Sequence, residues 1–190
     1  MKKQIITIAG RPGSGKSTTA KAVATELSFH HFSSGDLFRS IAKEWHTDVL
    51  QANLSAEKNA KIDELVDGKL QEIGKNDNEL VIDSRMAWHW MPFSYKVFLD
   101  LDLTVAAQRI LGAVGERELG NENIPMYPAE YAQELKRRLD SETRRYKMLY
   151  KVDPYDMNNY DLIVDTAKNN AEQVAEQIVQ GFREWLNSSV

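Results

Sequence analysis

The strongest constraint on the fold of this chain lies close to its start, where residues 10–17 read Gly-Arg-Pro-Gly-Ser-Gly-Lys-Ser. This segment matches the P-loop pattern G-x-x-x-x-G-K-[ST], in which glycines let the backbone curl so that successive N–H groups point at phosphate oxygens. The preceding Gln4–Ala9 is rich in β-branched residues, as in a buried strand, and Lys16–Leu27 is predicted to be a helix. Because the motif lies between strand and helix, it predicts a nucleoside triphosphate site rather than a ligand-free glycine-rich turn.

Two side chains of this loop have distinct expected roles. Lys16 is expected to reach the β- and γ-phosphates, and the Ser17 hydroxyl is expected to bind Mg²⁺. Asp83 ends a later predicted strand and is favoured as a holder of a Mg²⁺-bound water, whereas Asp100 is expected to be a helix cap or loop acid. The nucleotide-binding residues predicted from the motif are Gly10, Arg11, Pro12, Gly13, Ser14, Gly15, Lys16, Ser17 and Thr18.

Strands and helices are predicted to alternate along the rest of the chain. The further predicted strands are His30–Phe32, Leu80–Asp83, Lys96–Asp100 and Asp161–Asp165. The further predicted helices are Asp36–Trp45, Ser55–Ile73, Leu103–Leu111, Ala129–Tyr150 and residues 171–186. This alternation predicts an α/β fold of the P-loop type, with a doubly wound, five-stranded parallel sheet. Ligands of such sheets bind at the carboxyl ends of the strands.

The composition excludes several classes of protein. The 190-residue chain has no cysteine, which excludes disulfides, thiolate zinc sites and cysteine nucleophiles. Its formal net charge of −4 argues against a general nucleic-acid binder. The apolar stretch Ile5–Gly10 is too short for a signal peptide or a membrane span. His30, His31 and His46 lack ligand spacing and are expected to be structural or surface residues. We expect one cytoplasmic domain over residues 1–190, with no nucleic-acid or membrane partner.

A P-loop alone does not name a reaction, because switches, motors and kinases share it. The sequence has no guanine-reading N-K-x-D segment, which argues against a GTP-binding switch. The segment Ser33–Arg39 (SSGDLFR) follows the second predicted strand and opens a helix, where Arg39 could bind a phosphate bidentately. Taken alone, the simpler interpretation is favoured, in which Ser34 caps the helix and Arg39 is solvated.

The predicted helix Ala129–Tyr150 carries a second arginine pattern. At about 100° per residue, Arg138, Glu142 and Arg145 fall within roughly 60° of one another, beside an apolar stripe. Arg144 is expected to point toward solvent, as is Arg137. A salt-bridged surface helix is the commoner outcome for such a pattern. In a P-loop protein we favour a functional role for these arginines, because phosphoryl transfer needs positive side chains beside the migrating phosphoryl group.

The P-loop, SSGDLFR, LVIDSR and RRLDSETRRY occur in this order over essentially the whole chain. Together they resemble the nucleoside monophosphate kinases, and most of all the short cytidylate kinases of the archaeal type. The resemblance implies that Arg109 reaches the donor phosphates from near the start of a mobile lid. Arg117, inside the lid loop, is a further candidate, although a solvated charge fits it equally well. The residues implied to bind the acceptor are Ser34, Arg39, Arg85, Arg138, Glu142 and Arg145.

Two positions depart from the family's pattern. Ser84 stands where the family usually has glycine, and Met86 stands where bacterial cytidylate kinases have the aspartate that reads cytosine. Met86 cannot accept a hydrogen bond from a cytosine amino group as a carboxylate does. Asp63 is a possible substitute reader, although a solvated helix acid is the simpler interpretation. The cluster Trp88-His89-Trp90 could stack on the base or could line the core.

The expected function is therefore a nucleoside monophosphate kinase that uses ATP and Mg²⁺ to convert CMP or dCMP to the diphosphate. An acceptor-binding flap over residues 36–73 and a lid over residues 112–128 are expected to close over the substrates. We expect a monomer. The alternatives are a P-loop kinase for another small acceptor and a nucleotide-binding regulatory module without turnover. The predicted catalytic residues are Lys16, Arg109, Arg138 and Arg145.

Overall fold

The computed structural model describes residues 2–44, 56–113 and 127–188. In this part of the chain one sheet has the strand order β2-β3-β1-β4-β5, and every neighbouring pair is parallel. The predicted doubly wound, five-stranded parallel sheet is therefore confirmed. Its strands are β1 (Ile5–Gly10), β2 (His30–Ser33), β3 (Leu80–Asp83), β4 (Tyr95–Asp100) and β5 (Leu162–Asp165).

The helices follow the predicted order with changes at their ends. The short helix α5 (Ala87–Trp90) and a 3₁₀ turn at Met157–Asn159 were not expected from periodicity, since both are too short to show a helical repeat. Helix α6 (Leu103–Ala113) continues two residues past its predicted end, so the first residues of the predicted lid are helical. The α-helices are α1 (Lys16–Leu27), α2 (Ser34–Glu44), α4 (Ala56–Asn76), α5 (Ala87–Trp90), α6 (Leu103–Ala113), α8 (Pro128–Tyr150) and α9 (Ala171–Asn187).

The side chains of β1 alternate between two cores, one on each face of the sheet. Ile6 and Ile8 are fully buried in the core that α1 and α9 cover. Ile5 is fully buried on the opposite side, in the core that α4 and α5 cover. A strand buried on both faces has to be apolar at successive positions, which explains the sequence of β1.

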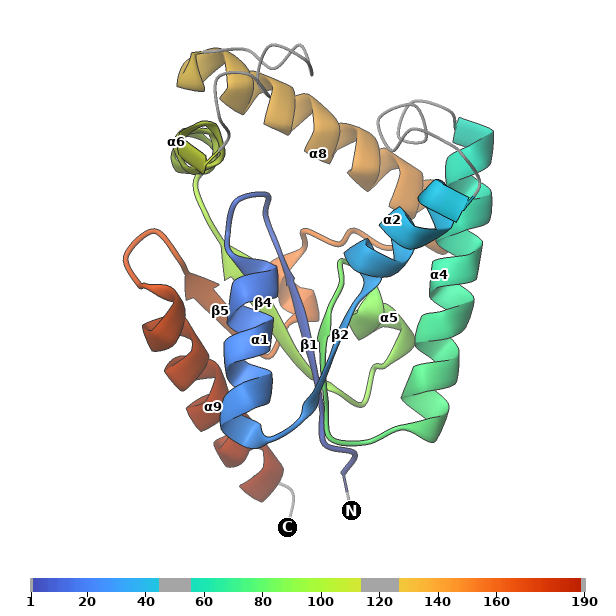
Figure 1. Cartoon of the computed structure of the whole chain (residues 1–190), viewed down its shortest axis with the longest axis vertical. Coiled ribbons are helices and arrows are strands. Elements are labelled where there is room, and N and C mark those ends of the chain that lie inside the picture. Colours follow the sequence, from blue (N-terminus) through green and yellow to red (C-terminus); the bar gives the residue numbers. More distant parts are fainter. Residues whose placement is uncertain (1, 45–55, 114–126, 189–190) are drawn as a thin grey trace.

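Helix α8 lies across the carboxyl ends of the strands, above the loop between β1 and α1 (Figure 1). Its first half packs against α6 through a small apolar cluster that includes Leu135 and Ala106. Its second half reaches α4, where Arg145 pairs with Asp63. The P-loop is therefore covered by a long helix whose inward side chains face the end of the sheet at which ligands bind.

Some predicted features lie outside the described residues. These are Arg117 and most of the predicted lid, within residues 114–126, together with His46 and the middle of the acceptor flap, within residues 45–55. Among the helices that the structure describes, none combines the length and the apolar character needed to span a bilayer.

Candidate active site

The loop after β1 has the curled backbone that its glycines predict. Gly13 has φ +70°, and a Cβ there would lie 3.2 Å from the carbonyl oxygen of Ala106 in α6. Gly15 has φ +82° and is the residue that precedes the first turn of α1. Residues other than glycine are strained in this left-handed backbone conformation, and a Cβ at Gly13 would also be crowded by α6. The loop therefore has the curled backbone that the motif predicts and leads into the start of a helix, and phosphate binding by its N–H groups stays a prediction.

Lys16 lies within this loop. Its ammonium group donates hydrogen bonds of 3.1 Å to the carbonyl oxygens of both Gly10 and Arg11. The pKa of Lys16 is lowered to about 8, mainly by burial and next by the nearby charge of Arg85, although Asp83 and Glu142 act in the opposite direction. Lys16 is thus enclosed among the charged side chains that the sequence analysis assigned to the site.

Ser17 and Asp83 are brought together by the sheet order. Strands β1 and β3 are neighbours, so the end of β3 lies beside the first turn of α1. The Ser17 hydroxyl donates a hydrogen bond to the Asp83 carboxylate, which is on a residue only 6 % exposed. The Ser34 hydroxyl donates to the Asp83 carbonyl oxygen at 3.2 Å. A hydroxyl and a carboxylate beside a phosphate cradle are oxygen groups suited to Mg²⁺.

Glu142 on α8 holds two of the predicted arginines. Its carboxylate lies 3.2 Å from Arg85 Nε and 3.4 Å from Arg138 Nε. The Tyr155 hydroxyl also donates to it, at 2.8 Å. Burial disfavours the charge of Glu142, but Arg85, Arg138 and Tyr155 outweigh burial and bring its pKa below the usual value. The carboxylate is therefore ionised and holds two guanidinium groups in place near Lys16.

One turn further along α8, Arg145 faces helix α4. Its Nε lies 3.5 Å from a carboxylate oxygen of Asp63, and its guanidinium lies 5.1 Å from the centre of the Tyr146 ring. Arg144 is exposed, and Arg137 pairs with Glu134 on the solvent side of the helix. The predicted division of the α8 arginines is observed in their partners: Arg138 and Arg145 pair with the mostly buried acids Glu142 and Asp63, although the Arg138 side chain is itself 53 % exposed.

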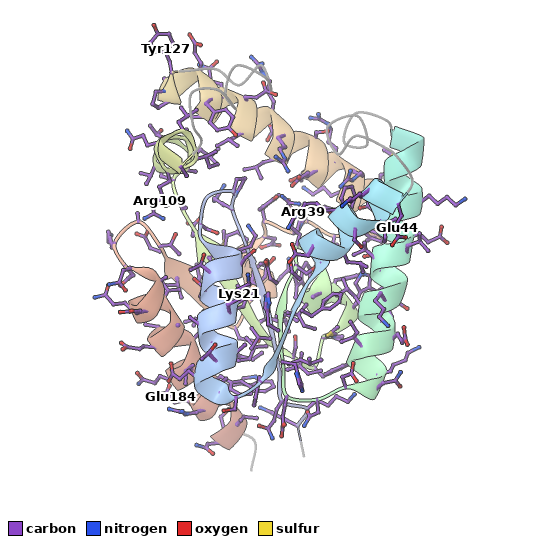
Figure 2. The ribbon with its side chains drawn as sticks, viewed as in Figure 1. Lys21, Arg39, Glu44, Arg109, Tyr127 and Glu184 are labelled. Carbon is purple, nitrogen blue, oxygen red and sulfur yellow. The ribbon has the colours of Figure 1, made fainter. Side chains whose placement is uncertain are left out.

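Two predicted arginines are not part of this cluster. Arg39 is largely exposed and pairs with Asp36, one turn earlier on α2. Arg109 donates a hydrogen bond of 2.8 Å to the Thr166 carbonyl oxygen. Figure 2 shows Arg39 on α2 and Arg109 on α6, on opposite sides of the P-loop. Asp100, expected to be a cap or loop acid, forms an ion pair with Arg11 at 2.5 Å.

The aromatic residues that follow Arg85 lie in different surroundings. Trp88 is 7 % exposed, packs with Phe98, and donates from its indole nitrogen to the Arg85 carbonyl oxygen. It therefore lines the core, which decides between the two interpretations for this residue. Trp90 is partly buried and donates to a carboxylate oxygen of Asp67 at 2.9 Å.

Sequence reasoning missed the part that Tyr155 and Asp67 play. Tyr155 lies in irregular chain after α8, where no periodicity indicates which way a side chain points. Asp67 accepts hydrogen bonds from Trp90 and from the Tyr150 hydroxyl. Its spacing of four residues from Asp63 on a predicted helix was the available signal that both carboxylates share one face.

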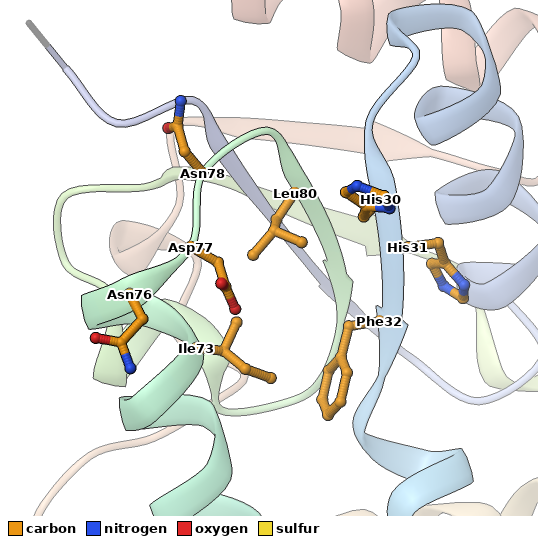
Figure 3. Close-up of a pocket in the computed structure, with 8 residues that line it drawn as sticks. All are labelled: His30, His31, Phe32, Ile73, Asn76, Asp77, Asn78 and Leu80. Carbon is orange, nitrogen blue, oxygen red and sulfur yellow. The ribbon is translucent and has the colours of Figure 1, made fainter.

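A separate pocket lies at the other end of the sheet. It has a volume of about 510 Å³ and lies between β2 and the end of α4 (Figure 3). Its lining residues are His30, His31, Phe32, Ile73, Asn76, Asp77, Asn78 and Leu80. Because these residues surround the amino ends of β2 and β3, the pocket is remote from the P-loop and is not the candidate active site.

The fold and the site together define a P-loop kinase: a phosphate cradle, an acid at the end of the neighbouring strand, and inward arginines on the helix above. Residues 9–148 match a family described as an AAA domain. A shikimate kinase structure from Bacteroides thetaiotaomicron has a TM-score of 0.63 and 18 % identity, covering 97 % of this chain and 98 % of that one. A gluconokinase structure from Sinorhizobium meliloti has a TM-score of 0.59 and 14 % identity, covering 98 % of this chain and 95 % of that one. These structures support the fold.

Curated protein sequences are more similar to this chain than the sequences of these structures are. The chain is 36 % identical to a cytidylate kinase from Halobacterium salinarum, over 92 % of this chain and 87 % of that protein. It is 40 % identical to a cytidylate kinase from Haloarcula marismortui, over 86 % of this chain and 81 % of that protein. It is 37 % identical to a cytidylate kinase from Methanocaldococcus jannaschii, over 90 % and 92 %. The chain belongs to the cytidylate kinase family, as the order of its motifs predicted.

Proposed function

We propose that the protein transfers the γ-phosphoryl group of ATP to CMP or dCMP, giving ADP and CDP or dCDP. The observation that carries this proposal is the ion-pair arrangement in which Glu142 holds Arg85 and Arg138 beside Lys16. A protein that only binds ATP needs the P-loop but has no use for a second set of inward arginines. Phosphoryl transfer needs them, because the acceptor phosphate and the migrating group are both anionic.

The donor side of the site is the P-loop. We propose that its residues, Gly10 to Thr18, bind the ATP phosphates, with Lys16 leaving its carbonyl partners to reach the β- and γ-phosphates. Arg109 would join them after it releases the Thr166 carbonyl oxygen. The N–H groups at the start of α1 add a fixed positive potential that favours the triphosphate.

Ser17 and Asp83 fit a magnesium site. Their hydrogen bond brings a hydroxyl and a carboxylate within reach of one ion. Mg²⁺ is commonly held by one or two protein oxygens together with substrate phosphates and waters, so a larger protein cage is not required. We propose that Ser17 binds the ion directly and that Asp83 holds one of its waters. The bound ion would neutralise charge on the β- and γ-phosphates.

The acceptor side is proposed to lie between α8, α2 and the end of β3. Arg85 and Arg138 would hold the acceptor phosphate, and Ser34 and Arg145 would contact the rest of the acceptor. Arg39 would reach the acceptor phosphate only after it separates from Asp36. Glu142 keeps its two arginines oriented while the phosphates are absent, which reduces the reorganisation needed when they bind.

Transfer then depends on alignment and charge. With the two phosphates held in line, the acceptor oxygen attacks the γ-phosphorus as the bond to the β-phosphate oxygen breaks. Lys16, Arg109, Arg138 and Arg145 are proposed to neutralise charge in the transition state. A covalent enzyme intermediate is not required.

We also propose the organisation around this site. The chain would act as one domain and as a monomer in the cytoplasm. The flap over residues 36–73 and the lid over residues 112–128 would close over acceptor and donor. Closure would exclude water, which otherwise would compete as an acceptor and hydrolyse ATP.

A coupled assay of ADP release tests the function directly. We expect the largest kcat/KM with CMP or dCMP in a panel that also contains UMP, AMP and GMP. A clear preference for AMP or GMP would contradict the choice of cytidylate while leaving a nucleoside monophosphate kinase. No release of ADP with any of the five would contradict both.

A further inference from the structure

Asp63 on α4 is the one acid near the proposed acceptor site, within the described residues, whose carboxylate has an open buried oxygen. Its side chain is 13 % exposed, and its Oδ2 lies 3.5 Å from Arg145 Nε. Both Oδ2 and that nitrogen are buried, and neither has a hydrogen-bond partner. Buried polar atoms without partners are costly and uncommon, so this paired acceptor and donor indicate a place for a ligand's polar edge.

Asp67, one turn further along α4, is a useful contrast. Its two carboxylate oxygens accept hydrogen bonds from the Trp90 indole and from the Tyr150 hydroxyl. Those bonds tie α4 to α5 and to the end of α8, so Asp67 has a structural role. Asp63 Oδ2 has no such bond in the described part of the chain; it faces Arg145 Nε at 3.5 Å and can accept from a ligand.

The position of Asp63 relative to the phosphate-binding residues suits one end of a nucleotide. Arg138 and Arg145 are seven residues apart on α8, which is a rise of about 10 Å. Arg138 lies at the Lys16 end of this span, and Arg145 with Asp63 lies at the α4 end. A nucleoside monophosphate whose phosphate is held at Arg138 would extend its base toward α4.

The residue after Arg85 cannot read that base. Met86 is 3 % exposed and offers only a thioether sulfur. Recognition of a polar base edge then falls to another element, and within the described residues α4 presents an acceptor, Asp63, that faces a donor, Arg145.

We propose that Asp63 and Arg145 together read the edge of the base, with the Asp63 carboxylate accepting from an exocyclic amino group and Arg145 Nε donating to the adjacent ring nitrogen. Cytosine presents this order of donor and acceptor, whereas uracil presents a carbonyl oxygen and a ring N–H in the reverse order. The inference rests on the proposed function and deepens it: the site selects amino bases over oxo bases. Arginine has five N–H donors; one at Nη2 of Arg145 goes to the Tyr146 hydroxyl at 3.4 Å, and the remaining terminal N–H groups are left for the rest of the acceptor and the migrating phosphoryl group.

The charge state of Asp63 gives a second consequence. Burial raises the pKa of Asp63 to about 6, while Arg145 opposes the shift. The other ionisable groups that act on it are Asp67 on the same helix, Glu142, Tyr146 and Tyr150 on α8, and Arg85 after β3. Below about pH 6 the protonated carboxyl can donate to the uracil carbonyl oxygen, so the preference for CMP over UMP should decline with acidity.

The variant Asp63→Asn tests the inference, because an amide can donate where the carboxylate can only accept. We expect the ratio of kcat/KM for CMP to that for UMP to fall at least about 10-fold, since the amide can accept from cytosine or donate to uracil and so no longer leaves an unpaired polar group with the oxo base. Glu64→Gln is the matched control, because Glu64 is the next residue on α4 and is exposed; its ratio should equal that of the wild type.

The outcomes separate this inference from the proposed function. Wild-type protein inactive with every monophosphate would contradict the proposed function. Wild-type activity with CMP, together with an unchanged ratio in folded Asp63→Asn, would overturn the inference alone. If Asp63→Asn does not fold, the pH profile of the wild type decides: a CMP-to-UMP ratio that stays constant from neutral pH to below about pH 6 overturns the inference.

Discussion

The Ser17 hydroxyl in the first turn of α1 donates a hydrogen bond to the Asp83 carboxylate at the end of β3, across 66 positions of sequence. The contact exists because β3 is inserted next to β1 in the sheet, which brings the end of β3 beside the P-loop. Two oxygen groups with different charges thus meet where Mg²⁺ is expected with ATP. Their hydrogen bond also fixes the orientation of the Ser17 side chain.

Asp83→Asn should raise the Mg²⁺ concentration needed for half-maximal activity by at least about 10-fold, because the amide keeps the shape of the carboxylate and removes its charge. Changes to groups around a metal ligand typically cost 10- to 100-fold in metal affinity or activity. A Mg²⁺ titration of initial rates measures this. Asp165→Asn is the control, since Asp165 also ends a strand but is exposed. An equal Mg²⁺ requirement in Asp83→Asn and wild type would remove Asp83 from the metal site.

Lys16→Ala should abolish phosphoryl transfer and leave the fold intact. Lys16 contacts only loop carbonyl oxygens through its ammonium group, so the core does not depend on it. Turnover is measured by ADP release, and the fold is checked by circular dichroism and thermal unfolding. Lys21→Ala, an exposed change on the same helix, should retain wild-type turnover. If Lys16→Ala kept most of its turnover, the P-loop would not be a catalytic site.

The sequence predicted those parts of the site that depend on local sequence patterns. The P-loop follows from its motif, and the common face of Arg138, Glu142 and Arg145 follows from the helical period. The contact between Glu142 and Tyr155 could not be predicted, because it joins a helix to irregular chain. Trp88 shows the same limit: its aromatic character fits both core and ligand, and only the packing around Phe98 decides between them.

Arg145→Ala should lower turnover by at least about 100-fold, which corresponds to one lost charge contact in the transition state. Arg144→Ala should have little effect, because Arg144 is exposed although it is the adjacent residue. Steady-state kinetics with CMP on both variants measures the difference. Similar losses in the two variants would contradict the assignment of one face of α8 to the site.

Glu142→Gln should reduce both activity and stability. The change leaves Arg85 and Arg138 without the carboxylate that now lies 3.2 and 3.4 Å from them. Removing one partner from a mostly buried charged group typically costs about 2 kcal/mol. Urea unfolding at neutral pH measures this loss. Glu134→Gln is the control on the same helix, because its partner Arg137 is exposed and such pairs contribute under about 1 kcal/mol.

The pH dependence of the stability difference between wild type and Glu142→Gln tests whether that difference is electrostatic in origin. The pKa of Glu142 in the folded protein lies below its usual value of 4.5, because Arg85, Arg138 and Tyr155 outweigh the effect of burial. A carboxyl with a lowered folded-state pKa stabilises the fold fully above its unfolded-state pKa, and this contribution disappears as the pH falls through the folded-state pKa. The stability difference between wild type and Glu142→Gln should therefore be constant from neutral pH down to about pH 5 and should shrink in more acidic solution. A difference independent of pH throughout the acidic range would mean that Glu142 stabilises the protein by packing rather than by its charge.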